Sequence, residues 1–341
     1  MNSALPLAGL TVLDFSHALA GPYATMLMAT YGARVIKVEG VEAGDIGRGW
    51  GPPFIGTEAA YFLAMNPGKR SLAISLKDPR GLALCRRLVS QSDVLLENFR
   101  PGTMTRLGLG YDDVRQLNPG LIYCSISGYG QTGPRRDEPA MDLILQAACG
   151  LISVTGTEAG ETVRAGHSVA DITAGMLSLI GILMALRVKE TTGQGQFVDV
   201  SMLDGMISAM ASNFASLFGS GSSPGPRGTA FGTIVPYACF PTADREIAIA
   251  VASDKLWLSF CTAAERPEWA HDVRFASNAV RVFNRASLEP MIVALLRTQP
   301  AEHWLAKLRQ AGVPCALVNN LAEVVADPQA TARQMFPTVD H

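Results

Sequence analysis

Short β-type runs alternate with helical segments from residue 11 to residue 201, and this alternation constrains the fold more than any other feature. The β-type runs lie at 11–15, 34–38, 93–99, 121–126 and 196–201, and the helical segments lie at 21–32, 79–91, 112–117 and 168–189. Strands that alternate with helices in this way form a parallel sheet with helices on both faces. We therefore expect an α/β fold for this part of the chain.

A stretch rich in glycine, serine and proline at 219–226 is the clearest boundary in the chain. Such a composition is typical of a linker, and a chain of 341 residues is longer than one compact core usually holds. Residues 202–218, before the stretch, look helical, and two β runs follow it. The expected layout is a large domain at 1–202, a helix with the linker at 203–225, a small α+β domain at 226–310 and a final segment at 311–341.

Charge and cysteine usage exclude several classes of protein. The 28 basic and 30 acidic residues give a net charge of −2 without a basic block, so we expect neither nucleic acid nor a membrane as partner. The six cysteines form no C-x-x-C pair and no zinc-type spacing with histidine, so no metal site is expected. These cysteines, and a start without the segments of a signal peptide, predict a cytoplasmic protein.

Asp171 stands directly before fifteen uncharged residues, 172–186, which are too few to span a bilayer and predict a buried helix. A carboxylate in the first helical turn faces free backbone N–H groups and the positive end of the helix dipole, which would keep it ionised. An ionised carboxylate that is partly shielded from water can act as a nucleophile. Ser168 and Asp171 also fit a capping box, in which the acid only ties down the helix start. These residues alone favour the cap.

Three glycines after a predicted strand, Gly128, Gly130 and Gly133, match the G-x-G-x-x-G pattern of dinucleotide sites. In such sites a helix begins at the third glycine, and an acidic residue follows about 20 residues later. Residues 134–139 begin and end with proline and cannot start that helix, and the acidic residue is missing. We therefore interpret this segment as a flexible glycine loop.

Several polar side chains follow predicted strands or turns and have two interpretations each. Lys69 and Arg70, and also Arg106, are cations that are either simply solvated or bind phosphate groups. His17 follows the first strand, at the sheet edge where α/β folds bind ligands, and a single histidine there is more often structural than catalytic. None of these signals is specific by itself.

Ordered motifs nevertheless run along nearly the whole chain. They lie at 7–14, 20–22, 32–39, 44–45, 69–71, 97–102, 127–134, 170–175, 192–202, 236–237 and 312–315. In this order they resemble the family III CoA-transferases, the group of formyl-CoA transferase, carnitine CoA-transferase and alpha-methylacyl-CoA racemase. The resemblance implies a Rossmann-like parallel-sheet large domain, a smaller α+β domain and a homodimer of two interlinked rings. It also implies that 311–341 returns toward the large domain and that family members continue beyond the position of His341.

The same resemblance implies the site. Asp171 would be the acyl-accepting nucleophile, with Asp142 beside it, and backbone N–H groups of the glycine loop could stabilise oxyanions. The residues implied around coenzyme A are His17, Lys69, Arg70, Asn98, Phe99 and Arg106. Acyl-CoA would be a substrate, and no tightly bound cofactor would be required.

The function that we expect is therefore an acyl-CoA:carboxylate CoA-transferase that works through an aspartyl-CoA thioester. Alternatives are a 2-methylacyl-CoA racemase of the same fold, a nicotinamide-binding oxidoreductase and a non-catalytic CoA-binding protein. Met141 stands where racemases of the family carry histidine, and methionine cannot shuttle a proton. Residues 228–233 lack the glycine-rich lid of the formyl-CoA branch, and Leu19 replaces a glutamine near its oxalate site. The sequence leaves the donor and acceptor acids open.

Overall fold

The computed structural model describes residues 5–338, and its internal contacts divide the chain into two compact units. The first unit is Met1–Pro226 and the second is Arg227–His341. The boundary between the units lies at the end of the stretch 219–226, so the segment 203–225, expected to be a helix with the linker, is part of the first unit. The domain bounds that we expected stay a prediction.

The first unit contains a six-stranded sheet in which every neighbouring pair of strands is parallel. Its strands are β1 (Thr11–Asp14), β2 (Arg34–Glu39), β5 (Arg70–Ala73), β6 (Val94–Glu97), β7 (Ile122–Ser127) and β8 (Phe197–Ser201). They lie in the order β5-β2-β1-β6-β7-β8, which is the strand order of doubly wound dinucleotide-binding sheets. The order reverses between β1 and β6, and ligands of such sheets bind at the carboxyl ends of these strands.

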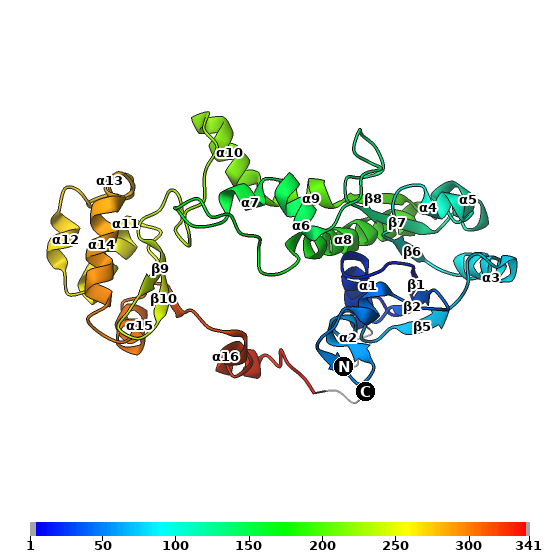
Figure 1. Ribbon diagram of the computed structural model, residues 1–341, viewed down its shortest axis with the longest axis horizontal. Helices are drawn as coiled ribbons and strands as arrows, with labels where there is room; N and C mark the ends of the chain where they lie inside the picture. Colours follow the sequence, from blue (N-terminus) through cyan, green and yellow to red (C-terminus); the bar gives the residue numbers. More distant parts are fainter. Residues whose placement is uncertain (1–4, 339–341) are drawn as a thin grey trace. The chain divides into compact units, whose positions relative to one another are not determined.

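Helices cover both faces of this sheet, as the alternation predicted (Figure 1). On one face α1 (Ala20–Thr30) and α8 (Val169–Thr192) pack on the apolar side chains of Val12 and Leu96. On the other face α3 (Pro79–Val89) and α5 (Tyr111–Leu117) pack on those of neighbouring strand residues. Successive residues of β1 and β6 therefore face opposite layers, and both layers are apolar.

Helix α8 is not the buried helix that its sequence predicted. Its buried residues are mostly small, among them Ala170, Ala174 and Gly175. Large apolar residues face outward instead: Met176, Leu177, Ile180, Leu183 and Met184 are each between 37% and 66% exposed. By length and composition α8 also passes as a membrane-spanning helix, with 33% of its most apolar stretch buried. Helices in the core of globular proteins can meet the same criteria.

The remaining elements of the first unit are short. They are the 3₁₀ turn at Ile46–Gly49, the hairpin β3 (Phe54–Ile55) and β4 (Glu58–Ala59), and the helices α2 (Ala60–Met65), α4 (Thr103–Arg106), α6 (Asp142–Ala148), α7 (Leu151–Val154), α9 (Met202–Ala209) and α10 (Ala211–Ser220). The sequence indicated a single helix at 202–218. The structure divides it at Met210, which ends α9 and precedes α10.

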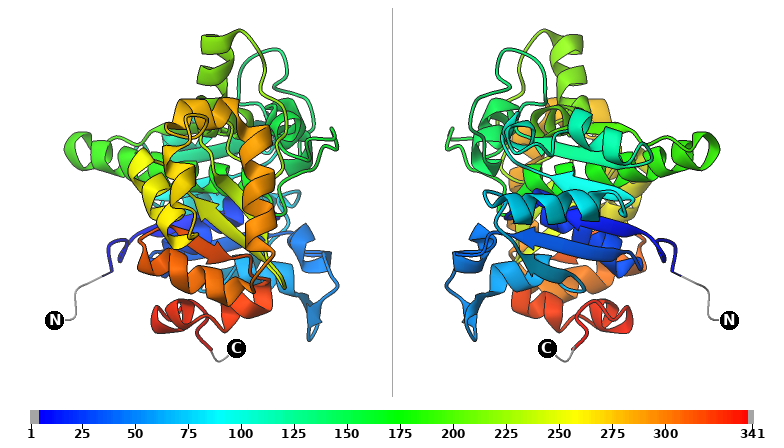
Figure 2. Two further views of the ribbon diagram at one scale, coloured as in Figure 1. Left: turned by 90° about the vertical axis from the view of Figure 1, so that its left-hand side faces the viewer. Right: turned by 90° about the vertical axis from the view of Figure 1, so that its right-hand side faces the viewer.

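The second unit is a three-stranded antiparallel sheet with helices packed on it (Figure 2). The strands, in the order β11-β10-β9, are β9 (Tyr237–Pro241), β10 (Glu246–Ala250) and β11 (Cys315–Leu317). The helices that contribute to the core on this sheet are α11 (Asp254–Ala263), α12 (Pro267–His271), α13 (Asn278–Phe283), α14 (Arg285–Leu296) and α15 (Ala301–Gln310), and α16 (Leu321–Val325) and α17 (Pro328–Ala332) follow β11 along the chain. Because β11 pairs with β10, the segment from 311 onward begins inside this sheet.

Candidate active site

The loops that follow β1 and β6 meet at the reversal point of the large sheet. The side-chain amide of Asn98 accepts a hydrogen bond from the His17 N–H at 2.8 Å and donates one to the His17 carbonyl at 2.9 Å. The rings of His17 and Phe99 lie 5.4 Å apart. The sequence assigned these three residues to one site, and the structure brings them together because strand order places their loops side by side.

The turn after β1 is held from several sides. Lys37 donates to the Ser16 carbonyl at 2.7 Å and lies 2.8 Å from the Asp45 carboxylate, which accepts from the Ala18 N–H at 3.0 Å. Ala18 has φ 65°, a left-handed conformation that residues other than glycine rarely adopt. A strained residue persists only where its surroundings determine it. These contacts fix the direction in which the next N–H groups of the turn point.

The carboxylate of Asp171 accepts a hydrogen bond from one of those N–H groups. The backbone N–H of Ala20 donates to its carboxylate, while burial and then the charge of Asp142 raise the pKa of Asp171 to about 7. The prediction that the helix dipole keeps this group fully ionised is therefore wrong near neutral pH. Loss of water and a second carboxylate outweigh the dipole and the single hydrogen bond. Near neutral pH the group is therefore present in both its protonated and its ionised form, and such perturbed pKa values are frequent at functional sites.

The capping-box alternative is also wrong. Ser168 precedes α8 but its side chain makes no capping hydrogen bond. Instead Asp142, the first residue of α6, accepts from the Ala170 N–H at 2.8 Å. A carboxylate distant in sequence thus caps the helix, and the side chain of Asp171 is directed to Ala20. Gly175 permits this approach, because a Cβ atom there would lie 2.7 Å from the Ala20 carbonyl oxygen.

Tyr61 is a further polar residue here that the sequence did not single out. It lies on α2, where burial and then the charges of Asp171, Asp45 and Asp142 raise the pKa of its phenol. Its ring lies 5.2 Å from that of Trp50. Tyr61 therefore lies within electrostatic reach of both site carboxylates. No spacing or motif marks it, because α2 is a six-residue helix of ordinary composition.

Lys69 does not have the free ammonium group that phosphate binding requires. Its Nζ donates to Asp14 at 3.1 Å, to the Pro22 carbonyl at 2.8 Å and to Asn66 at 2.8 Å, and 2% of its side chain is exposed. Burial, opposed by the attraction of Asp14, lowers the pKa of Lys69 to about 8. Direct contact between Lys69 and a phosphate does not fit this burial, so its predicted role is corrected.

Two other predicted phosphate-binding cations, Arg70 and Arg106, are exposed. Arg70 begins the edge strand β5, and Arg106 ends the short helix α4, where its guanidinium donates to the Thr103 hydroxyl at 3.0 Å. Both side chains are free to turn toward a ligand.

The glycine loop is followed by turns, as its prolines predicted, and α6 begins only at Asp142. Gly130 and Gly133 have φ 84° and 88°, and a Cβ atom on Gly128 would lie 2.2 Å from that of Ala140. All three positions therefore require glycine. The N–H of Gln131 donates to Asp199 at 3.1 Å, which ties the loop to β8. The oxyanion role of this loop stays a prediction.

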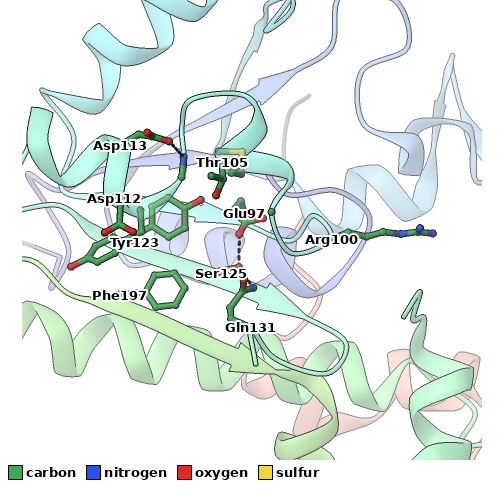
Figure 3. A pocket seen from close by; sticks show the side chains of 13 residues that line it. Glu97, Arg100, Thr105, Asp112, Asp113, Tyr123, Ser125, Gln131 and Phe197 are labelled. Carbon is green, nitrogen blue, oxygen red and sulfur yellow. Dashed lines mark hydrogen bonds between the residues drawn. The ribbon is translucent and has the colours of Figure 1, made fainter. Parts of the chain in front are cut away.

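A cavity of about 170 Å³ lies beside the glycine loop (Figure 3). The carboxylate of Glu97 accepts hydrogen bonds from the Ser125 hydroxyl and from the Phe99 N–H, the latter at 2.8 Å. The side-chain amide of Gln131 donates to the Ser125 hydroxyl at 2.9 Å. Burial raises the pKa of Glu97 to about 7. Asp171 is absent from the lining. The cavity thus lies between the loop that follows β6 and the glycine loop, and its lining contains neither the predicted nucleophile nor any residue predicted around coenzyme A.

A doubly wound sheet with a partly buried carboxylate beside its reversal point is the arrangement of an α/β protein with an acidic site. The model of "CoA-transferase family III" matches residues 7–341. Succinyl-CoA:glutarate CoA-transferase from Homo sapiens is 37% identical over 342 residues, covering 100% of this chain and 78% of the relative. Acetyl-CoA:oxalate CoA-transferase from Acetobacter aceti is 38% identical, and the match covers 97% of this chain and 85% of that relative.

Solved structures agree with these sequence matches. The crystal structure of a CAIB/BAIF family protein from Brucella suis has a TM-score of 0.88 and 38% identity, covering 98% of this chain and 89% of that one. The chain belongs to the family III CoA-transferases. It is an enzyme that moves CoA between carboxylic acids, as the resemblance indicated, and the nicotinamide-binding and non-catalytic alternatives are set aside.

Proposed function

We propose that Asp171 carries the CoA transfer by becoming covalently linked first to an acyl group and then to CoA. The observation that supports this role is the environment of its carboxylate: it is largely withdrawn from water, held by the Ala20 N–H and given a pKa of about 7. A desolvated carboxylate is a stronger nucleophile than a hydrated one. Asp142 holds the start of α8 and is proposed to position Asp171.

The proposed sequence exchanges one bond at a time. The Asp171 carboxylate attacks the donor thioester carbonyl, expels CoA thiolate and forms a mixed anhydride. The thiolate then attacks the aspartyl carbonyl, which releases the donor acid and leaves an aspartyl-CoA thioester. The acceptor carboxylate attacks this thioester, and the freed thiolate takes the new acyl group from the second anhydride. Asp171 returns as a carboxylate, and covalent catalysis has divided a difficult exchange into easier steps.

The names of the two relatives suggest the acids. Glutarate and oxalate are both dicarboxylates, and we propose a dicarboxylate acceptor for this chain. A panel of acyl-CoA donors and free acids, followed by mass spectrometry of the products, tests this assignment. Preferential transfer to dicarboxylates supports it, and a preference for monocarboxylates of equal length contradicts it.

Arg106 and Lys69 provide a contrast for CoA recognition. The Arg106→Ala change should raise the KM for acyl-CoA by about tenfold with less effect on the acid acceptor, because it removes uniform binding of the CoA phosphates. The Lys69→Met change should instead lower the unfolding temperature, because it removes the ammonium group that forms an ion pair with the buried Asp14 carboxylate. Steady-state kinetics and thermal unfolding of both variants check this. Equal KM increases for both substrates in Arg106→Ala would indicate a fold defect instead.

Met141 predicts the type of reaction. This residue precedes Asp142, its side chain is 65% exposed, and it cannot transfer a proton. A 2-methylacyl-CoA incubated with the protein in heavy water should therefore gain no deuterium at its α-carbon, as nuclear magnetic resonance would detect. Rapid incorporation would show that another residue shuttles protons, and would favour a racemase.

We also propose that the protein is a cytoplasmic homodimer with a Rossmann-like large domain. The outward-facing residues of α8 support dimerisation, because contiguous apolar surface of this kind marks an interface. Leu143 and Ile144 of α6 add to it with 50% and 48% exposure. A partner copy that covers these residues would explain why large side chains face outward while small ones are buried.

Sedimentation tests this proposal. The unaltered protein should sediment as a dimer at every dilution, and Ile180→Lys with Met184→Lys should yield monomer or aggregate because charges would be buried in the interface. A stable monomer of the unaltered protein would contradict the dimer. Vesicle flotation tests whether a membrane covers this face instead, because only a membrane-bound protein would float with the vesicles.

A further inference from the structure

Gln146 is a buried polar side chain that none of the roles above uses. It lies one turn after Asp142 on α6, and none of its surface is exposed. Its Oε1 accepts from the Ala165 N–H at 2.8 Å, and its Nε2 donates to Asp142 Oδ2 at 2.6 Å. A backbone N–H can only donate and an ionised carboxylate can only accept. These two neighbours therefore fix the orientation of the amide.

Asp142 transmits this restraint to the start of α8. Its second oxygen, Oδ1, accepts from the N–H of Ala170, the residue before Asp171. Its charge is also the second cause, after burial, of the raised pKa of Asp171. Both the position and the charge of Asp142 therefore act on Asp171, and Gln146 is the side chain that holds Asp142 by its other oxygen.

We propose that Gln146 is a positioning residue for CoA transfer, which holds Asp142 against the start of α8 and so orients Asp171. The inference rests on the proposed nucleophilic role of Asp171. An N–H donated to a carboxylate stabilises its charge, and a buried network is strong only when each member is satisfied. The contact with Ala165 ties the segment before α8 to the same amide. One side chain thus fixes both the cap of α8 and the backbone that leads into it.

The Gln146→Glu variant makes this contact depend on a proton while keeping the shape of the side chain. One glutamate oxygen still accepts from Ala165, and the other meets Asp142, where two carboxyl groups must share a proton. At about pH 6.5 kcat/KM should stay within about threefold of the unaltered protein. At about pH 9 the shared proton is lost and the two carboxylates repel each other. At this pH kcat/KM should be about tenfold or more below that of the unaltered protein.

The Gln146→Met variant removes both hydrogen bonds at similar volume. It should lower kcat about tenfold at every pH, with the KM for acyl-CoA within about threefold, because orientation and not binding is lost. Ser178→Ala is the matched control. Ser178 is equally buried on α8 and donates to the Ala174 carbonyl, away from Asp142. Its pH profile should match that of the unaltered protein.

An alkaline loss confined to Gln146→Glu, with unfolding temperatures at neutral pH close to that of the control, supports the proposal. A Gln146→Glu protein with an unchanged profile, or one inactive at neutral pH, overturns it, and so does an unchanged kcat in Gln146→Met. If Gln146→Met does not fold, the glutamate variant still decides. Failure of the proposed function looks different, because an Asp171→Ala protein would then still transfer CoA.

Discussion

Replacing Asp171 by asparagine should abolish CoA transfer and stabilise the protein at the same time. Loss of the nucleophile should lower kcat roughly 10⁴-fold or more. The amide oxygen can still accept the Ala20 N–H, so the site should keep its shape. The asparagine carries no charge, and the cost of burying a carboxylate beside Asp142 disappears.

The stability gain should depend on pH in a definite direction. The pKa of Asp171 rises from 3.8 to about 7 on folding, so the folded chain binds the extra proton between these values. The stability of the unaltered protein should therefore fall as the pH rises from about 4 to about 7 through this group. Asp171→Asn should gain on the order of 2–4 kcal/mol at about pH 8 and almost nothing at about pH 4.

Urea unfolding at both pH values measures this difference, with loss of native circular dichroism as the signal. Asp171→Ala is the companion variant, because it also removes the nucleophile but leaves the Ala20 N–H without its acceptor. If Asp171→Asn is less stable than the unaltered protein at the higher pH, burial of the ionised Asp171 carboxylate does not destabilise the fold. Retained transfer in both variants would refute the covalent mechanism.

Replacing Asp14 by alanine should have the largest effect on stability. Asp14 is fully buried and accepts from the Ser16 N–H at 2.9 Å, from Thr25 at 2.6 Å and from Lys69 at 3.1 Å. Its removal leaves the buried ammonium of Lys69 without a counter-charge. Breaking a buried pair in this way costs about 3–5 kcal/mol. The turn at 16–20, and with it the N–H that Asp171 accepts, should loosen.

The pH dependence of this pair has the opposite sign to that of Asp171. Although burial acts to raise it, the charges of Lys69 and Lys37 and two hydroxyl groups hold the pKa of Asp14 at about 2. The stability from Asp14 is therefore present above about pH 4 and is lost as the pH falls toward 2. Chemical unfolding of Asp14→Ala should show the loss of this stability. Glu190→Ala is an exposed control, whose free energy of unfolding should change little. Equal stability of both variants would contradict a structural role for Asp14.

The parallel sheet could be predicted from the sequence because its central strands are fully buried. β6 has three apolar residues before Glu97, β7 is a run of apolar and small residues, and the intervening helices have clear starts and stops. β5 was missed, since it is an exposed edge strand that begins with Arg70 and pairs only with β2. α6 was missed because seven residues give little periodicity.

The resemblance named candidate site residues, but their contacts and electrostatic environments could not be predicted from the sequence. Asn98 and His17 are 81 residues apart, and only the reversal of strand order brings them together. Lys69 follows a turn, which favoured a free cation, but the sequence does not reveal that Asp14 lies over its ammonium group. The pKa of Asp171 depends on burial and on a carboxylate 29 positions earlier, neither of which a local pattern encodes.

The most direct test of the central proposal is to trap the covalent intermediate. The protein is incubated with an acyl-CoA donor without an acceptor acid, treated with hydroxylamine, digested and analysed by mass spectrometry. Hydroxylamine converts an aspartyl thioester or anhydride to a hydroxamate, which should appear on the peptide that contains Asp171 and only after exposure to donor. Transfer activity without a hydroxamate on that peptide, or with one on Asp142 instead, would contradict the account.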